Sequence, residues 1–117
     1  MSLNLVPASG RQTVGAANGG KVYPFNNIST TPQQVIGANP GRAKLTFHNP
    51  GAQDIMVAPA IQANGQTLTV STALLGGCYR VFANGGDRVI EGECQTAWQA
   101  FSVSGSSLPL TVSESNV

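Results

Sequence analysis

Apolar and polar side chains alternate along several short stretches of the chain. The clearest stretch is 43–49, in which Leu45 and Phe47 alternate with Lys44 and Thr46. A period of two indicates a β-strand that buries one face and exposes the other. No stretch shows the apolar period of a helix, so the pattern favours an all-β chain.

Eight or nine such segments follow one another between turn signals, among them Asn39-Pro40-Gly41, Asn49-Pro50-Gly51 and Asn84-Gly85. The expected strands cover residues 21–25, 33–38, 43–49, 54–58, a segment from 67 to 70, 78–82, 88–91, 96–103 and 108–112. Pro24 confines the first of them to a sheet edge or a bulge. Short strands at near-regular spacing predict a β-sandwich or jelly roll.

The core is expected where large apolar residues fall in strand-like contexts. The residues predicted to be buried are Leu45, Phe47, Ile55, Val57, Val81, Val89, Phe101 and Leu110. A chain of 117 residues has room for one such core.

Residues 1–20 differ from the rest because they show neither strand alternation nor a helical apolar stripe. Small and flexible residues dominate this segment, and they cannot bury enough surface to order it alone. We therefore expect an extended N-terminal arm at 1–20 that lies against another subunit, followed by a single β-sandwich domain at 21–117. The residues expected to bind the partner are the apolar anchors and the one charged side chain of the segment: Leu3, Leu5, Val6, Arg11 and Val14.

Charged residues make up only 9% of the chain, and six Lys and Arg oppose five Asp and Glu. Nucleic-acid binders and membrane-surface proteins carry a clear basic excess, so neither partner is expected. Interface cores are depleted in charge, so the composition favours a surface that is largely covered by other subunits. The first residues lack the pattern of a signal peptide, and no apolar run approaches a membrane span. We expect a soluble protein that is made in the cytoplasm.

Catalytic chemistry is not expected, and neither a cofactor nor a metal site is predicted. The single histidine, His48, falls on the polar face of its strand, where one imidazole cannot supply a metal site or a catalytic pair. Glu91 and Glu93 resemble solvated loop charges more than a glycosidase pair. Cys78 and Cys94 are too few for a disulfide scaffold and are expected to be reduced.

The stretch 33–50 contains Ile36-Gly37-Ala38-Asn39-Pro40-Gly41-Arg42-Ala43-Lys44-Leu45-Thr46-Phe47-His48-Asn49. It resembles a segment of the form I-x-A-N-x-x-R-x-x-L-x-x-x-N that occurs in many small structural proteins of tailed bacteriophages. There it precedes a short strand like Asp54-Ile55-Met56-Val57, so the resemblance spans residues 33–57. Size and composition fit the capsid decoration, or cement, proteins best.

This resemblance implies a β-sandwich or jelly-roll body on the outer capsid surface of the virion, after assembly in the host cytoplasm. It implies the major capsid protein and other copies of the chain as partners, as a dimer in preference to a trimer. It transfers no individual functional residue. The alternatives are a phage tail, fibre or head-completion component, or a carbohydrate-binding β-sandwich module, which would need an exposed aromatic cluster.

Overall fold

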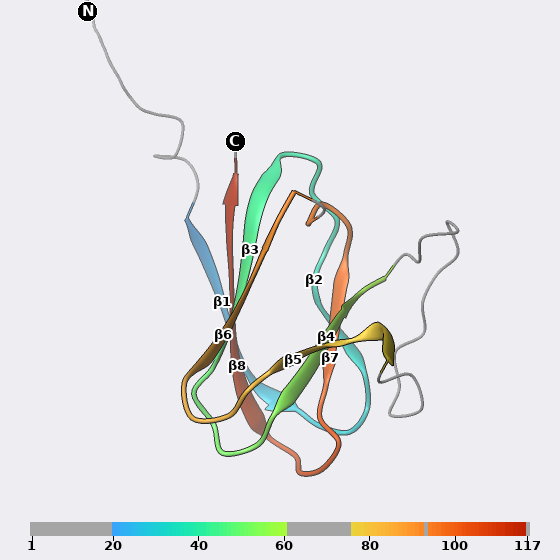
Figure 1. Ribbon diagram of the computed structural model, residues 1–117, viewed down its shortest axis with the longest axis vertical. Helices are drawn as coiled ribbons and strands as arrows, with labels where there is room; N and C mark the ends of the chain where they lie inside the picture. Colours follow the sequence, from blue (N-terminus) through green and yellow to red (C-terminus); the bar gives the residue numbers. More distant parts are fainter. Residues whose placement is uncertain (1–19, 61–75, 93, 117) are drawn as a thin grey trace, which may run out of the picture.

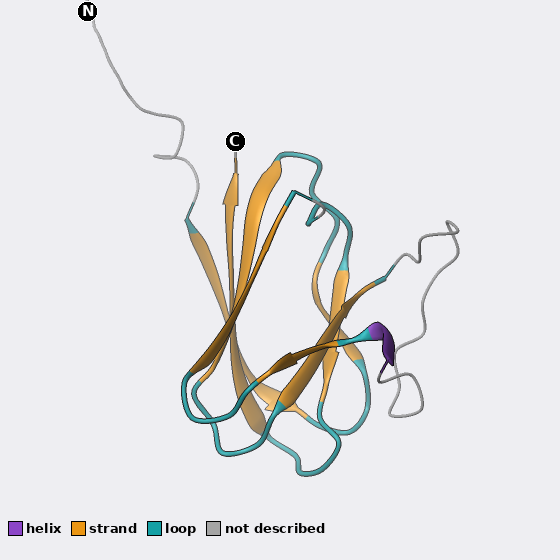
Figure 2. Ribbon diagram, in the orientation of Figure 1, coloured by secondary structure: helices purple, strands orange, loops and turns teal. Residues whose placement is uncertain are grey.

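The computed structural model of the protein describes residues 20–60, 76–92 and 94–116. These residues form an all-β structure of two antiparallel sheets that face each other (Figures 1 and 2). The strands are β1 (Lys21–Ile28), β2 (Gln33–Ile36), β3 (Arg42–Asn49), β4 (Ile55–Pro59), β5 (Tyr79–Val81), β6 (Gly86–Glu91), β7 (Trp98–Phe101) and β8 (Leu108–Asn116). The predicted β-sandwich is confirmed.

The first sheet has the strand order β1-β8-β3-β6 and the second has the order β2-β7-β4-β5. Each strand of the first half pairs with its counterpart in the second half, as β1 with β8, β2 with β7, β3 with β6 and β4 with β5. The chain is therefore one long antiparallel ribbon, doubled back between β4 and β5. The pairs β3–β8 and β4–β7 then join the ribbon to itself within each sheet.

The core fills the space between the inner faces of the sheets. Leu45, Phe47, Ile55, Val57, Val81 and Leu110 are buried in this core as predicted, and Trp98 from β7 joins them. Phe101 is also buried as predicted, but it packs with Met56 and Ala58 in a separate cluster. The Phe47 and Trp98 rings lie 5.6 Å apart between centroids. Contacts between the two sheets thus come largely from residues that the sequence pattern predicts to be buried.

The prediction for Val89 is wrong, because its side chain is 50% exposed. Register decides which face of β6 is inside. Ile90 pairs with the buried Leu45, whereas Val89 pairs with Thr46 of β3. Directly opposed residues share a face, so Ile90 turns toward the core and Val89 turns away from it.

Strand lengths also differ from the expectation. β8 reaches Asn116, four residues beyond the predicted end at Val112. It lies between β1 and β3, so its polar end is held extended by pairing on both sides. β1 runs to Ile28 at an edge of its sheet, which accommodates Pro24 as expected. The expected strand from 67 to 70 lies outside the described residues, as do residues 1–19 of the expected arm.

Candidate functional site

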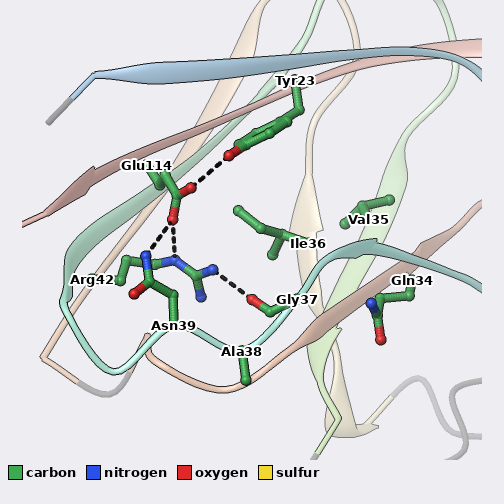
Figure 3. Close-up of a pocket in the computed structure, with 9 residues that line it drawn as sticks. All are labelled: Tyr23, Gln34, Val35, Ile36, Gly37, Ala38, Asn39, Arg42 and Glu114. Atoms are coloured by element: carbon green, nitrogen blue, oxygen red, sulfur yellow. Dashed lines mark hydrogen bonds and ion pairs between the residues drawn. The ribbon is translucent and has the colours of Figure 1, made fainter.

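The guanidinium of Arg42 is the centre of the largest polar cluster in the described part of the chain (Figure 3). Arg42 is only 1% exposed. Its Nε donates to Oε1 of Glu114 over 2.9 Å. Its Nη1 donates to the carbonyls of Cys94 at 2.6 Å and Thr96 at 3.0 Å, and its Nη2 donates to the carbonyl of Gly37 at 2.6 Å. One side chain thereby ties β3 to β8, to the turn after β2 and to the segment before β7.

Glu114 collects further donors on the same side. The hydroxyl of Tyr23 donates to its Oε2 over 2.7 Å, and Nδ2 of Asn39 donates to its Oε1 over 3.1 Å. Burial alone raises the pKa of Glu114, but the hydrogen bonds from Tyr23, Arg42 and Asn39 outweigh it and leave that pKa below its ordinary value. The pKa of Tyr23 is raised, first by its hydrogen bond to Glu114 and then by burial. The carboxylate is therefore ionised and accepts three side-chain hydrogen bonds.

An open pocket of about 480 Å³ lies beside this cluster. Its lining consists of Tyr23, residues 34–39, Arg42 and Glu114 (Figure 3). Arg42 and Glu114 are already engaged with each other and with protein partners, so the pocket offers them neither as an anion clamp nor as a general base. The cluster around Arg42 and Glu114 therefore stabilises one end of the sandwich.

A second pocket, which we call the β5–β6 slot, opens at the other edge of the first sheet. It has a volume of about 280 Å³ and is lined by Pro59, Tyr79, Val89, Ile90, Glu91 and Trp98. Both sheets contribute walls, because β6 belongs to the first sheet and β4, β5 and β7 belong to the second. Trp98 is 2% exposed, and its Nε1 has no hydrogen-bond partner among the described residues.

The residues expected to bind the partner, Leu3, Leu5, Val6, Arg11 and Val14, all lie outside the described residues. The structure therefore brings none of them to a site.

His48 sits on the outer face of β3 as expected, where its Nδ1 lies 2.6 Å from Oδ1 of Asp87 on β6. Both side chains are exposed, at 43% and 59%.

Cys78 and Cys94 form no disulfide with each other. Burial raises the pKa of the Cys78 thiol, which disfavours its reactive thiolate form. Cys94 is fully buried beside Arg42, and its Sγ lies 3.6 Å from the Arg42 carbonyl.

The sequence interpretation missed the Arg42–Glu114 cluster. A signal for Glu114 was present, because it continues the inward phase of Leu110 and Val112 along β8, where a charged side chain needs a buried partner. Arg42 was hidden by an irregularity in the pairing of β3 with β8 between Arg42 and Lys44. This register shift turns Arg42 inward although Lys44, two residues later, is exposed.

Among residues 20–60, 76–92 and 94–116, no group of three or more His, Cys, Asp or Glu side chains could hold a metal ion. The same residues include no helix of the length and apolarity needed to cross a membrane. In comparisons with known proteins, no family model, no curated protein and no solved structure matches this chain.

Proposed function

We propose that this chain is a non-catalytic structural protein of a phage virion, which binds the outer capsid surface and bridges neighbouring major capsid subunits. The observation that carries the proposal is the agreement between the phage-like segment 36–49 and the fold around it. The motif specifies six positions, and the structure uses these four of them to build the sandwich: Asn39, Arg42, Leu45 and Asn49.

Each of these positions has a structural role. Arg42 and Asn39 both donate to Glu114, and Leu45 is fully buried in the core. Asn49 is also fully buried, and its Nδ2 donates to the carbonyls of Gln53 and Val81. A segment whose specified residues determine a fold supports a shared architecture with the phage proteins that it resembles.

The strand order supports the finer assignment of the sandwich as a jelly roll. A ribbon of four nested antiparallel pairs, wrapped so that β1, β3, β6 and β8 form one sheet and the other four form its partner, is the connectivity of two Greek keys. Eight-stranded jelly rolls are common among viral capsid proteins. We infer that the body is of this kind.

The stabilising mechanism follows from binding thermodynamics. A protein bound across the seam between two capsid subunits must be released before they separate, so it stabilises the assembled shell by mass action. An arm at residues 1–20 that orders on contact covers a large surface from a small body, at an entropic cost. Many copies on one shell multiply the effect.

The outer face of the first sheet suits such a surface role. One cross-strand row runs from Val22 through Ser113 and Thr46 to Val89, and its two valines are 63% and 50% exposed. Small uncharged side chains keep the middle of this row flat. Low charge and exposed apolar side chains are typical of the centre of protein interfaces.

The test is cosedimentation of the purified full chain with empty phage heads, compared with a variant in which residues 2–18 are replaced by a Gly/Ser linker of equal length. The full chain should saturate the heads and raise the temperature at which they lose integrity. The linker variant should keep the β-sandwich circular dichroism spectrum and bind much more weakly. Failure of the full chain to bind heads, or its binding to tails or fibres instead, would overturn the capsid assignment.

A further inference from the structure

The β5–β6 slot has the features of a docking site for an extended peptide. Pro59, Val89 and Ile90 give it an apolar wall beside Glu91, and the edge strands of both sheets contribute to its lining. In the described part of the chain, β6 pairs only with β3 and β5 only with β4. Within the described residues neither strand has a second strand partner, although Nη2 of Arg88 donates to the Arg80 carbonyl of β5. Strand edges without a partner pair readily with an added strand.

An unpartnered donor marks the same place. The Nε1 of Trp98 is buried and makes no hydrogen bond to any described residue, although Trp98 lines the slot. A buried N–H without an acceptor costs free energy, so a bound group that supplies a carbonyl oxygen is favoured there. A polypeptide supplies both this carbonyl and an apolar side chain to fill the slot.

The rim is poorly suited to a flat ring ligand. The Tyr79 and Trp98 rings lie 5.9 Å apart between centroids. The guanidinium of Arg88 lies 5.6 Å from the centroid of the Tyr79 ring. Trp98 in turn also contacts Phe47. The aromatic faces are thus largely taken by protein neighbours, which leaves an apolar gap and a donor rather than a stacking platform.

We propose that this slot receives the segment Leu3–Val6 from a neighbouring copy of the chain. The segment Leu3-Asn4-Leu5-Val6 is uncharged and has three apolar side chains, which suit the apolar wall formed by Pro59, Val89 and Ile90. The chain before β1 has 20 residues, which extended span at most about 70 Å, enough to reach another subunit.

The placement of donor and receptor favours exchange between copies. β1, which continues from this segment, is at one edge of the first sheet, and β6 is at the opposite edge. Each copy can then give its segment to one neighbour and receive a segment from another. Such a head-to-tail contact is heterologous, and it closes into a ring when the rotation between copies allows it. The proposal concerns contacts between copies and is tested without any capsid.

The experiment uses the full-length chain and four variants in sedimentation velocity over a range of concentrations. Val89→Asp places a carboxylate in the slot, Leu5→Asp places one in the donated segment, and Val103→Asp is the control, since Val103 is 48% exposed outside the slot. Val89→Asp and Leu5→Asp should each weaken self-association at least about tenfold, and Val103→Asp should change it less than about twofold. The fourth variant, Val89→Ser, replaces Val89→Asp if circular dichroism shows that the latter is unfolded.

Mixing provides the sharpest outcome. The Val89→Asp chain keeps an intact segment and the Leu5→Asp chain keeps an intact slot, so their mixture should form one-to-one dimers although neither variant associates alone. Trp98 is the only tryptophan, so its emission reports on the slot directly and should change with concentration in parallel with association. A chain that is monomeric at all concentrations, or a mixture that fails to associate, would overturn the proposal. So would an emission change caused by Leu5→Asp that is independent of concentration, because the segment would then occupy its own slot.

Discussion

The guanidinium of Arg42 and the carboxylate of Glu114 form a buried ion pair, with 2.9 Å between Nε and Oε1, that joins the start of β3 to the end of β8. The side chains are 1% and 6% exposed. Protein groups therefore replace water around both side chains. The groups that accept hydrogen bonds from Arg42, besides Glu114, are the carbonyls of Gly37, Cys94 and Thr96.

Removing the arginine should therefore be costly. Arg42→Met leaves the Glu114 carboxylate buried without its cation, and we expect a loss of roughly 3–5 kcal/mol in the free energy of unfolding measured with urea. The matched control is Arg80→Met, because Arg80 pairs with Asp54 over 3.3 Å at the surface. This exposed pair should contribute about 0–1 kcal/mol. Equal and small losses in the free energy of unfolding for the two variants would show that Arg42 contributes no more to stability than an exposed arginine does.

The same pair predicts a dependence of stability on pH. The pKa of Glu114 is lowered in the folded protein, so the unfolded chain binds more protons as the pH falls through the acidic range. The stability from this carboxylate is fully present above its unfolded pKa of about 4.3 and is lost as the pH falls through the lower folded pKa. Glu114→Gln should be less stable than the unmodified chain at pH 7, and this gap should narrow below about pH 4. Thermal unfolding of both chains at pH 7 and below about pH 4 measures this difference in stability. A difference that stays constant between the two pH values would contradict the prediction.

Much of the sandwich could be predicted from the sequence, because apolar and polar residues alternate with a period of two along a strand that has one buried face. Residues 43–49 show this directly, whereas β4 is buried on both faces and reads as a continuous apolar run. Strand pairing could not be predicted, because nothing local specifies that β3 lies between β8 and β6. Val89 illustrates the consequence, since an apolar residue with an apolar neighbour, Ile90, gives no phase until the partner strand is known.

The candidate sites depend on long-range contacts in the same way. Arg42 and Glu114 are 72 residues apart in sequence, and the slot joins Pro59 to Trp98 and Val89. A sequence pattern records that Glu114 is in phase with a core face, but it does not record which cation neutralises it.

Phe47 should be among the most sensitive core positions. It is fully buried and packs against the Trp98 ring at 5.6 Å between centroids. Phe47→Ala should lower the free energy of unfolding by roughly 3–5 kcal/mol, from lost burial and the cavity that remains. Phe82→Ala is the control, because Phe82 is 59% exposed and should cost no more than about 1 kcal/mol. Chemical denaturation of both variants measures these losses. Similar losses in the free energy of unfolding would contradict the packing of Phe47 described above.

His48 should be dispensable for both folding and binding. Its only polar contact in the described residues is the exposed one to Asp87, at 2.6 Å. Exposed pairs of this kind contribute about 0–1 kcal/mol, so His48→Gln should shift the melting temperature little and leave the binding to phage heads intact. Loss of head binding by a folded His48→Gln variant would assign this residue a role in recognition.

The turn before β6 places a strict demand on Gly86. Asn84 and Gly85 adopt positive φ angles of 62° and 98°, and the amide of Gly86 donates to the Phe82 carbonyl over 3.1 Å. The amides of Asn84 and Gly85 donate to the carbonyls of Gly51 and Asn49, so this turn is also held against the turn after β3.

A methyl group at Gly86 has no space, because its Cβ would lie 2.3 Å from the Phe82 carbonyl oxygen and 2.9 Å from the Phe82 backbone nitrogen. These are backbone atoms, so a rotamer change cannot relieve the overlap. Gly86→Ala must therefore displace the turn and the first residue of β6, with an expected loss of about 1–3 kcal/mol. Gly76→Ala is the control, since no described residue lies within 4 Å of a Cβ there and its φ is not positive. Urea denaturation should separate the two variants, and an unchanged midpoint for Gly86→Ala would mean that this turn does not have the conformation described above.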